Sequence, residues 1–261
     1  MKRRTFLTAS AVSLSATSGC LGVLGGGGSG GEPPMPADGN MDGRPPAFDD
    51  QPDERDVDTN SFGTVSESGV EVPLAPVDVA HYWYKQGETR FVDARSVSQY
   101  EASHVYGAVL SQADPNRRGD DPVTDWPTDE RVVCYCGCPH HLSSMRASEM
   151  IQNGFENVYV IDEGFWEWHD NGYPMRGNDV TATPENWVVG GEVAAAFAGE
   201  NAWAHHRPSG QVESTDIGDD GNYELHLKFH DVGPDSTVEV ETPAYTVEGK
   251  LADLATGTVT G

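Results

Sequence analysis

The stretch VVCYCGCPHHLSSMRASEMI, residues Val132–Ile151, decides the fold. It begins within an apolar, β-branched run, Arg131–Tyr135, which is typical of a strand buried on both faces of a parallel sheet. Cys136 follows this strand directly, and residues 143–153 then have the pattern of a helix that ends at Gly154. In a turn of this kind, loop N–H groups and the helix N-terminus stabilise a thiolate and attract an anion. Cys136 is therefore the best-placed nucleophile.

Apolar and helical segments alternate on both sides of this stretch. Strands are predicted at 70–74, 90–94, 107–111 and 157–161, and helices at 76–87, about 96–103 and about 164–172. The alternation predicts an α/β domain with a mainly parallel sheet flanked by helices, in which ligands bind beyond the carboxyl ends of the strands. We assign this domain to residues 62–180. Residues 181–261 show strand alternation and turn sequences, and we expect a small β-rich C-terminal domain with no convincing site.

The N-terminal 61 residues have a different character. Residues 1–20 carry Lys2, Arg3 and Arg4, an uncharged, moderately apolar run and then Cys20, which resembles a twin-arginine export signal followed by a lipobox. We expect lipidation at Cys20 and anchoring to the outer face of the cell membrane, while a plain cleaved signal or a short anchor stays open. Residues 21–61 are rich in Gly, Pro and Asp, and we expect a disordered acidic tether.

The charge of the chain excludes some partners. The formal net charge is -26 and there are only four lysines, so a nucleic acid would be repelled. The acidic, lysine-poor composition resembles that of proteins from salt-in halophiles, and we expect folding to depend on salt.

Several ordered motifs resemble the rhodanese-like sulfurtransferases. FVDARSVSQYEASHVYGAVLS resembles the first signature of that family, through Asp93, Arg95, Tyr100, His104, Gly107 and Ala108. VVCYCGC and GFENVYVIDEGFWEWHDNGYPM resemble the active-site strand with its cysteine and the segments that close the domain. The similarity spans about residues 66–175.

The resemblance implies that Cys136 accepts a sulfane sulfur from a donor such as thiosulfate, holds it as a persulfide and passes it to a thiol or cyanide. It implies a substrate-binding loop made of Gly137, Cys138, Pro139, His140, His141, Leu142 and Ser143. The loop is about one residue longer than the common form and lacks the usual Arg or Lys, which leaves the substrate open. Asp93 and Arg95 are expected to support the loop, and His140 or His141 to supply positive charge at mildly acidic pH. The expected partners are a small sulfur-containing anion and a thiol acceptor, without cofactor or metal.

Other readings of the same residues stay open. Cys136, Cys138, His140 and His141 could bind zinc or copper, although such crowded ligands rarely complete a tetrahedron. Cys138 could resolve the persulfide, whereas Cys134 lies inside the apolar run. A Cys-x5-Arg phosphatase is disfavoured because Leu142 stands six positions after Cys136 and Arg146 comes too late. A non-catalytic sulfur- or metal-binding interaction module is the alternative function.

Overall fold

The computed structural model describes residues 41–261. The predicted export signal, the lipidation of Cys20 and the first part of the predicted tether lie outside the described residues. Within residues 41–261, no helix has the length and apolar character needed to cross a membrane.

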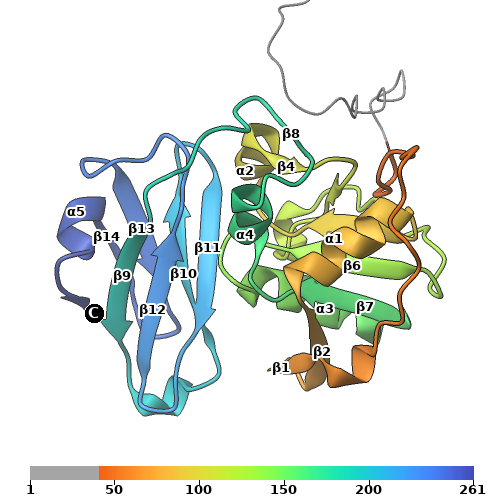
Figure 1. The fold of residues 1–261 in the computed structure, drawn as a ribbon. Helices are drawn as coiled ribbons and strands as arrows, with labels where there is room; N and C mark the ends of the chain where they lie inside the picture. The colour runs from red at the N-terminus through yellow and green to blue at the C-terminus, as the bar shows by residue number, and fades with distance from the viewer. Residues whose placement is uncertain (1–40) are drawn as a thin grey trace, which may run out of the picture. The chain divides into compact units, whose positions relative to one another are not determined.

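The first domain contains a mixed sheet and four helices (Figure 1). Its elements are β1 (Gly63–Glu67), β2 (Val70–Ala75), α1 (Val77–Gln86), β3 (Thr89–Asp93), α2 (Val97–Ala102), β4 (His104–Val105), β5 (Val109–Leu110), β6 (Arg131–Tyr135), α3 (His141–Gln152), β7 (Asn157–Ile161), α4 (Phe165–Asp170) and β8 (Met175–Arg176). The six-stranded sheet has the order β1-β2-β7-β6-β3-β5, and only the β1–β2 pair is antiparallel. A separate pair, β4 and β8, is antiparallel. The predicted α/β class is confirmed.

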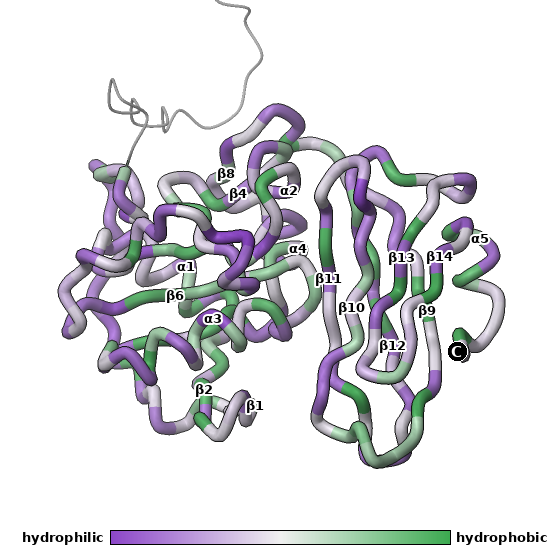
Figure 2. The backbone as a smooth tube through the Cα atoms, turned by 180° about the vertical axis from the view of Figure 1, so that it is seen from behind, coloured by the Kyte–Doolittle hydropathy of each residue, from purple (hydrophilic) through white to green (hydrophobic). Residues whose placement is uncertain are grey.

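The central position of β6 follows from its composition. Val132, Val133 and Cys134 are fully buried, and β6 is coloured as hydrophobic along much of its length in Figure 2. Val133 packs with α1 and α4 on one face, and Val132 and Cys134 pack with α3 on the other. A strand covered on both faces has no side that tolerates polar residues, which is why a continuous apolar run predicted it.

Element boundaries follow local chemistry. Helix α1 starts after Pro76 and ends at Gly87, whose φ of 74° is in the left-handed region. Helix α3 begins at His141, two residues before the predicted start, with His140 as an N-cap that makes no side-chain hydrogen bond. The strand predicted at 107–111 shortens to Val109–Leu110, because Gly107 has a φ of 95° and its Cα approaches the carbonyl oxygen of Arg44 too closely for a side chain.

Residues 181–261 form two small sheets that enclose their own core. The elements are β9 (Trp187–Glu192), β10 (Asn201–His206), β11 (Gln211–Asp216), β12 (Asn222–Leu227), β13 (Thr237–Glu241), β14 (Thr246–Lys250), α5 (Leu251–Leu254) and β15 (Thr258–Val259). The sheet orders are β11-β10-β13-β14 and β12-β9-β15. Strands β12 and β13 alternate buried and exposed residues, as their sequences predict. Strand β11, which the sequence analysis did not identify, contacts α2 and α3 of the first domain.

Part of the predicted tether, within its described residues 41–61, makes defined contacts with the first domain. Asp42 pairs with Arg90 and accepts a hydrogen bond from Trp126 Nε1 at 2.8 Å. The N–H of Phe91 in β3 donates to the Gly43 carbonyl at 2.7 Å. The charged residues that look solvated in the sequence therefore have partners far along the chain, and composition alone does not reveal them.

Candidate active site

Cys136 lies at the carboxyl end of β6, where the sequence analysis placed it. Its backbone carbonyl accepts a hydrogen bond from the N–H of Phe165, the first residue of α4, at 2.9 Å. Its thiol is fully buried, 3.3 Å from Ser143 Oγ and 3.2 Å from the carbonyl oxygen of Cys138. The strand end and two helices thus hold this sulfur in place.

The second cysteine of the loop lies beside the first. Cys138 Sγ is 3.4 Å from Cys136 Sγ, and both are free thiols. The hydrogen bond with Cys136 and burial raise the pKa of Cys138 well above its ordinary value, although N–H groups of Leu142 and His141 donate to it and oppose this rise. The first turn of α3 is therefore directed at Cys138.

Cys134 belongs to the core. It is fully buried, its Sγ lies 4.0 Å from Met150 Sδ, and burial raises its pKa to about 12. Its sulfur packs in a core cluster with Ala147 and Met150 of α3, apart from the cluster that holds Cys136 and Cys138. The site therefore contains two of the three described cysteines.

The other loop residues differ in their exposure to solvent. Leu142 and Ser143 are buried, and Pro139 is exposed. Gly164, at the start of α4, has a φ of 77°, and a Cβ there would lie 2.7 Å from the carbonyl oxygen of Cys138. Only glycine allows the backbone before α4 to approach the loop this closely.

The rings of the two histidines have polar partners other than the thiols. His141 lies 2.6 Å from Ser214 Oγ through Nδ1 and 3.0 Å from Asp216 through Nε2, so its ring connects the loop to β11. His140 Nε2 lies 4.0 Å from Asp162, and burial lowers the pKa of His140. The positive charge that we expected from His140 is thus disfavoured by its surroundings.

Asp93 and Arg95 form a buried ion pair next to the loop. Arg95 Nη2 lies 2.7 Å from Asp93 Oδ2 and also donates to the Ser103 carbonyl at 2.6 Å. The guanidinium lies 3.9 Å from the ring centroid of Phe165, the residue that binds the Cys136 carbonyl. The pair is thus linked to the loop through Phe165, and its role in supporting the loop stays a prediction.

Glu213 of β11 is the site residue that the sequence analysis missed. Its side chain is buried and reaches the loop, where Oε1 lies 2.6 Å from the position that a Cβ on Gly137 would occupy. The same oxygen accepts a hydrogen bond from Gln99 Nε2 at 3.2 Å. Arg95 Cδ and Trp166 Nε1 each lie 3.6 Å from that Cβ position, so three side chains surround Gly137.

Three polar atoms of these side chains have no hydrogen-bond partner among the described residues. They are Glu213 Oε2, Arg95 Nη1 and Trp166 Nε1. Burial raises the pKa of Glu213 well above its ordinary range and Cys138 adds to this, while Arg95 opposes it. Glu213 therefore favours its neutral form beside the thiols. Gln211, Glu213 and Ser214 of β11 are all buried, and no pattern in the sequence distinguishes them from exposed polar residues.

A shallow groove of about 210 Å³ opens beside the loop between α3 and the C-terminal sheets. From the first domain it is lined by Val65, Cys138, Pro139, His140, His141 and Ser144, and from the C-terminal sheets by Ser214, Thr215, Asp216, Glu224 and His226. Cys138 is thus the cysteine that borders the groove. The hydrogen bond with His141 lowers the pKa of Asp216, so an acidic charge stands at the groove.

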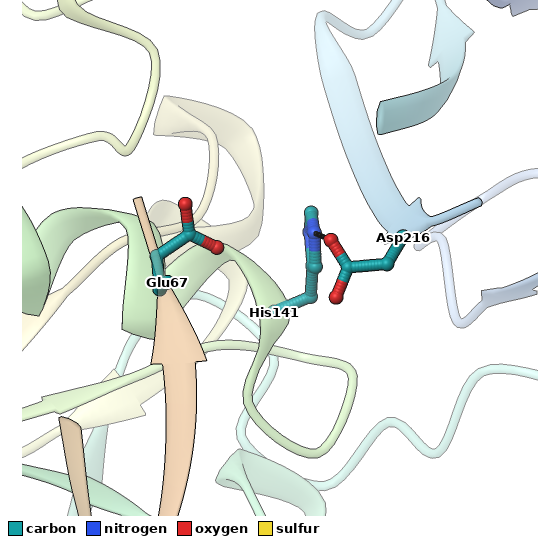
Figure 3. A group of neighbouring side chains, drawn as sticks. All are labelled: Glu67, His141 and Asp216. Carbon is teal, nitrogen blue, oxygen red and sulfur yellow. Dashed lines mark hydrogen bonds and ion pairs between the residues drawn. The ribbon is translucent and has the colours of Figure 1, made fainter. Parts of the chain in front are cut away.

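A cluster of potential metal ligands lies next to the loop, but it does not contain the two cysteines of the predicted alternative metal site. Glu67, His141 and Asp216 have ligand atoms within 4.8 Å of one another, and Figure 3 shows them coming from β1, α3 and β11. In the part of the chain that the structure describes, neither Cys136 nor Cys138 belongs to such a group. Both ring nitrogens of His141 already have polar partners, Ser214 and Asp216. The arrangement therefore does not support a site made of Cys136, Cys138, His140 and His141.

Arg146, the arginine considered for a phosphate cradle, is engaged away from the loop. Its Nε donates to Ser111 Oγ at 2.8 Å, and its Nη2 lies 2.7 Å from Asp121 Oδ2. The guanidinium group of Arg146 is therefore occupied and does not bind a phosphoryl oxygen at Cys136. The sequence already placed this arginine too far along the chain for a Cys-x5-Arg motif.

Replacing Glu213 by glutamine is expected to stabilise the protein at alkaline pH. An unfolded carboxyl titrates near 4.5, whereas the folded one keeps its proton to higher pH, so stability falls as pH rises between the two pKa values. Each unit of raised pKa corresponds to about 1.4 kcal/mol. Thermal unfolding at pH 4 and pH 8 should show Glu213→Gln gaining stability over wild type only at pH 8. The exposed Glu248→Gln serves as control, and an equal response of both variants would contradict the assignment.

The structure thus contains a buried thiol at the carboxyl edge of a parallel sheet, in the turn before a helix. In open α/β sheets this edge is where ligands bind. Residues 78–171 match the family model for the rhodanese-like domain. The α/β domain is therefore a rhodanese-like domain.

Relatives are similar over the same part of the chain. The thiosulfate sulfurtransferase GlpE of Vibrio cholerae serotype O1 is 28% identical over 109 residues, which cover 39% of this chain and 92% of that protein. Among solved structures, the rhodanese-like domain of an Anabaena sp. protein is 20% identical, with a TM-score of 0.37, covering 43% of this chain and 85% of its own. A rhodanese-related protein from Thermoplasma volcanium is 14% identical, with a TM-score of 0.35, covering 40% and 98%.

Proposed function

We propose that this protein is a sulfurtransferase that carries sulfane sulfur as a persulfide on Cys136. The observation that carries the proposal is the placement of this thiol directly after buried β6 and seven residues before Ser143, whose hydroxyl it contacts at 3.3 Å. The rhodanese-like domain and the relationship to a thiosulfate sulfurtransferase support activity of this class.

The proposed chemistry has two steps. The Cys136 thiolate attacks the outer sulfur of a donor such as thiosulfate, forms a sulfur–sulfur bond and releases sulfite. An acceptor thiol or cyanide then takes the terminal sulfur and restores the thiol. Arg95 cannot bind the donor with its full charge, because Asp93 neutralises it within the buried pair. The anion is therefore held by loop N–H groups and polar side chains.

The charge around the groove bears on the choice of donor. Asp216 and Glu224 line the groove, and Glu67 lies close to Asp216. These carboxylates repel a dianion, and salt weakens such repulsion over distances of several ångströms. We propose a small donor that contains sulfane sulfur, taken up more readily at high salt.

Sulfite release under single-turnover conditions tests this function. Wild-type protein mixed with thiosulfate should release sulfite in proportion to the protein, and excess cyanide present from the start should capture the sulfane sulfur as thiocyanate. Absence of both products with thiosulfate and with an organic thiosulfonate would favour the alternative, a non-catalytic interaction module.

We propose further that the protein is exported and lipid-anchored to the outer face of the cell membrane. The support is the sequence of residues 1–20, with Arg3, Arg4 and Cys20 in the order of an export signal and a lipobox. Replacing Cys20 by serine should move most of the protein from the membrane fraction to the soluble fraction. If Cys20→Ser protein sediments with membranes as wild type does, the anchor is not at this residue.

A further inference from the structure

Two thiols and one carboxyl group share a single buried space at the start of the loop. Cys136 Sγ and Cys138 Sγ are 3.4 Å apart, whereas a disulfide bond measures about 2.0 Å. A displacement of little more than an ångström, within a loop without further covalent restraint, would join them. Cys134 is not part of this space, because its sulfur contacts Met150 and belongs to a different core cluster from Cys136 and Cys138.

The carboxyl group of Glu213 stands over the peptide that links the two cysteines. It interacts with the Cys138 thiol, and Gln99 fixes its Oε1 through a hydrogen bond of 3.2 Å. Its Oε2 has no partner among the described residues, although the side chain is only 1% exposed. A buried carboxyl group with one fixed and one unsatisfied oxygen, next to a thiol, is suited to accept one proton and donate another.

We propose that Cys136, Cys138 and Glu213 form an internal centre that converts the Cys136 persulfide into hydrogen sulfide and a Cys136–Cys138 disulfide. This inference rests on the proposed function, which supplies the persulfide. It adds a second reaction, and it assigns a catalytic role to a residue of the C-terminal domain.

The reaction balances without an external oxidant. Cys138 Sγ attacks the inner sulfur of the persulfide, the new bond joins the two cysteine sulfurs, and the bond to the terminal sulfur breaks. The sulfane sulfur is reduced to sulfide, while the two cysteine sulfurs are oxidised to the disulfide. The neutral Glu213 carboxyl accepts the proton of Cys138 on one oxygen and gives its own proton to the departing hydrosulfide. Two equivalents of a small thiol then reduce the disulfide and reset the site.

The enclosure of the site favours this internal reaction over transfer to a large acceptor. Cys136 is fully buried, while Cys138 is its immediate neighbour and lies at the border of the groove. Strand β11 carries Glu213 into the loop and binds His141 through Ser214. A large external acceptor would have to displace β11 from the loop to reach Cys136. Cys138 is already within contact distance of the Cys136 sulfur.

Trypsin cleavage isolates the reacting cysteines in one peptide. Cleavage after Arg131 and Arg146 yields residues 132–146, which contain all three cysteines of the domain. Full-length protein is treated with thiosulfate in the absence of thiols, and sulfite, sulfide and the mass of this peptide are measured. Wild type should release sulfide, and its peptide should lose the mass of two hydrogen atoms. Cys138→Ser should release no sulfide, and its peptide should gain the mass of one sulfur atom.

Two further variants separate the roles. Glu213→Gln should release sulfide about a hundredfold more slowly, the scale of losing a proton-transfer group, and should accumulate the persulfide on the same peptide. Cys134→Ala is the matched control and should behave as wild type. A wild-type peptide that retains the added sulfur while sulfite is released would overturn the inference and leave the proposed function standing.

A second sulfur donor distinguishes the two proposals. Sodium tetrasulfide transfers sulfur to thiols chemically, so it can load Cys136 even if the protein does not use thiosulfate. If thiosulfate yields no sulfite but tetrasulfide yields the disulfide in wild type and the persulfide in Cys138→Ser, the resolving centre is supported and the thiosulfate activity is not. If tetrasulfide yields the persulfide in both proteins, the resolving centre is refuted.

Discussion

Cys136→Ala protein is expected to lose sulfite release from thiosulfate by about three orders of magnitude or more, the scale of removing a covalent nucleophile. Cys136 alone lies at the end of β6 with its carbonyl bound by the α4 N-terminus and its sulfur against Ser143. Removing its thiol eliminates the atom that bonds to the sulfane sulfur. Sulfite measured in rapid-quench experiments reports this step directly, before any acceptor takes part.

The matched control is Cys134→Ala, which removes a thiol two residues away in the same strand. Cys134 is buried against Met150 and has a pKa raised to about 12 by burial, so its loss should lower stability while the rate of sulfite release stays within about twofold of wild type. Substantial sulfite release by Cys136→Ala protein would assign the nucleophile to another residue, and Cys138 would be the candidate because the first-turn amides of α3 donate to it.

Arg95→Met protein is expected to lose about 3–5 kcal/mol of its free energy of unfolding, the scale of breaking a buried ion pair by removal of one partner. Both side chains of the Arg95–Asp93 pair are fully buried. Burial alone would lower the pKa of Arg95, but the charge and hydrogen bonds of Asp93 raise it overall, so the guanidinium is charged in the folded protein. Methionine preserves much of the volume and leaves the Asp93 carboxylate without its counter-ion.

Urea unfolding at constant salt measures this loss. Arg55→Met is the control, because Arg55 and Asp78 form a 3.3 Å pair whose side chains are 45% and 62% exposed. Such surface pairs contribute about 0–1 kcal/mol. A similar decrease in the free energy of unfolding for both variants would show that the buried pair stabilises the protein no more than the surface pair does. If Arg95→Met also slows sulfite release in protein that is still folded, the pair positions the loop through Phe165 as well.

Local sequence patterns predicted the α/β domain correctly because its elements have strong local determinants. The apolar run of β6, the Pro76 and Gly87 limits of α1 and the turn after Cys136 all depend on residues that are close together in the chain. The predicted bounds of β6 and β7 are those of the structure. The position of Cys136 follows from the same local order, since a residue directly after a buried parallel strand lies at the edge where ligands bind.

The surroundings of that cysteine depended on contacts between distant parts of the chain. Glu213 is 77 residues from Cys136, and in the sequence it is one acidic residue among many in a chain with a net charge of -26. Likewise, Asp42 and Arg44 have partners at Arg90 and Glu130, which composition does not reveal.

The sequence by itself determined the α/β class, the order of the main elements and a reactive cysteine after β6, because hydrophobic periodicity and turn chemistry act over a few residues. Only the tertiary structure decided that Cys138 and Glu213 share the space of Cys136 and that the rings of His140 and His141 lie next to Asp162 and Asp216. The packing of β11 against α3 brings a buried carboxyl group to the loop, and burial there changes its protonation. The protonation of Glu213 depends on the side chains packed around it, and these come from distant parts of the sequence.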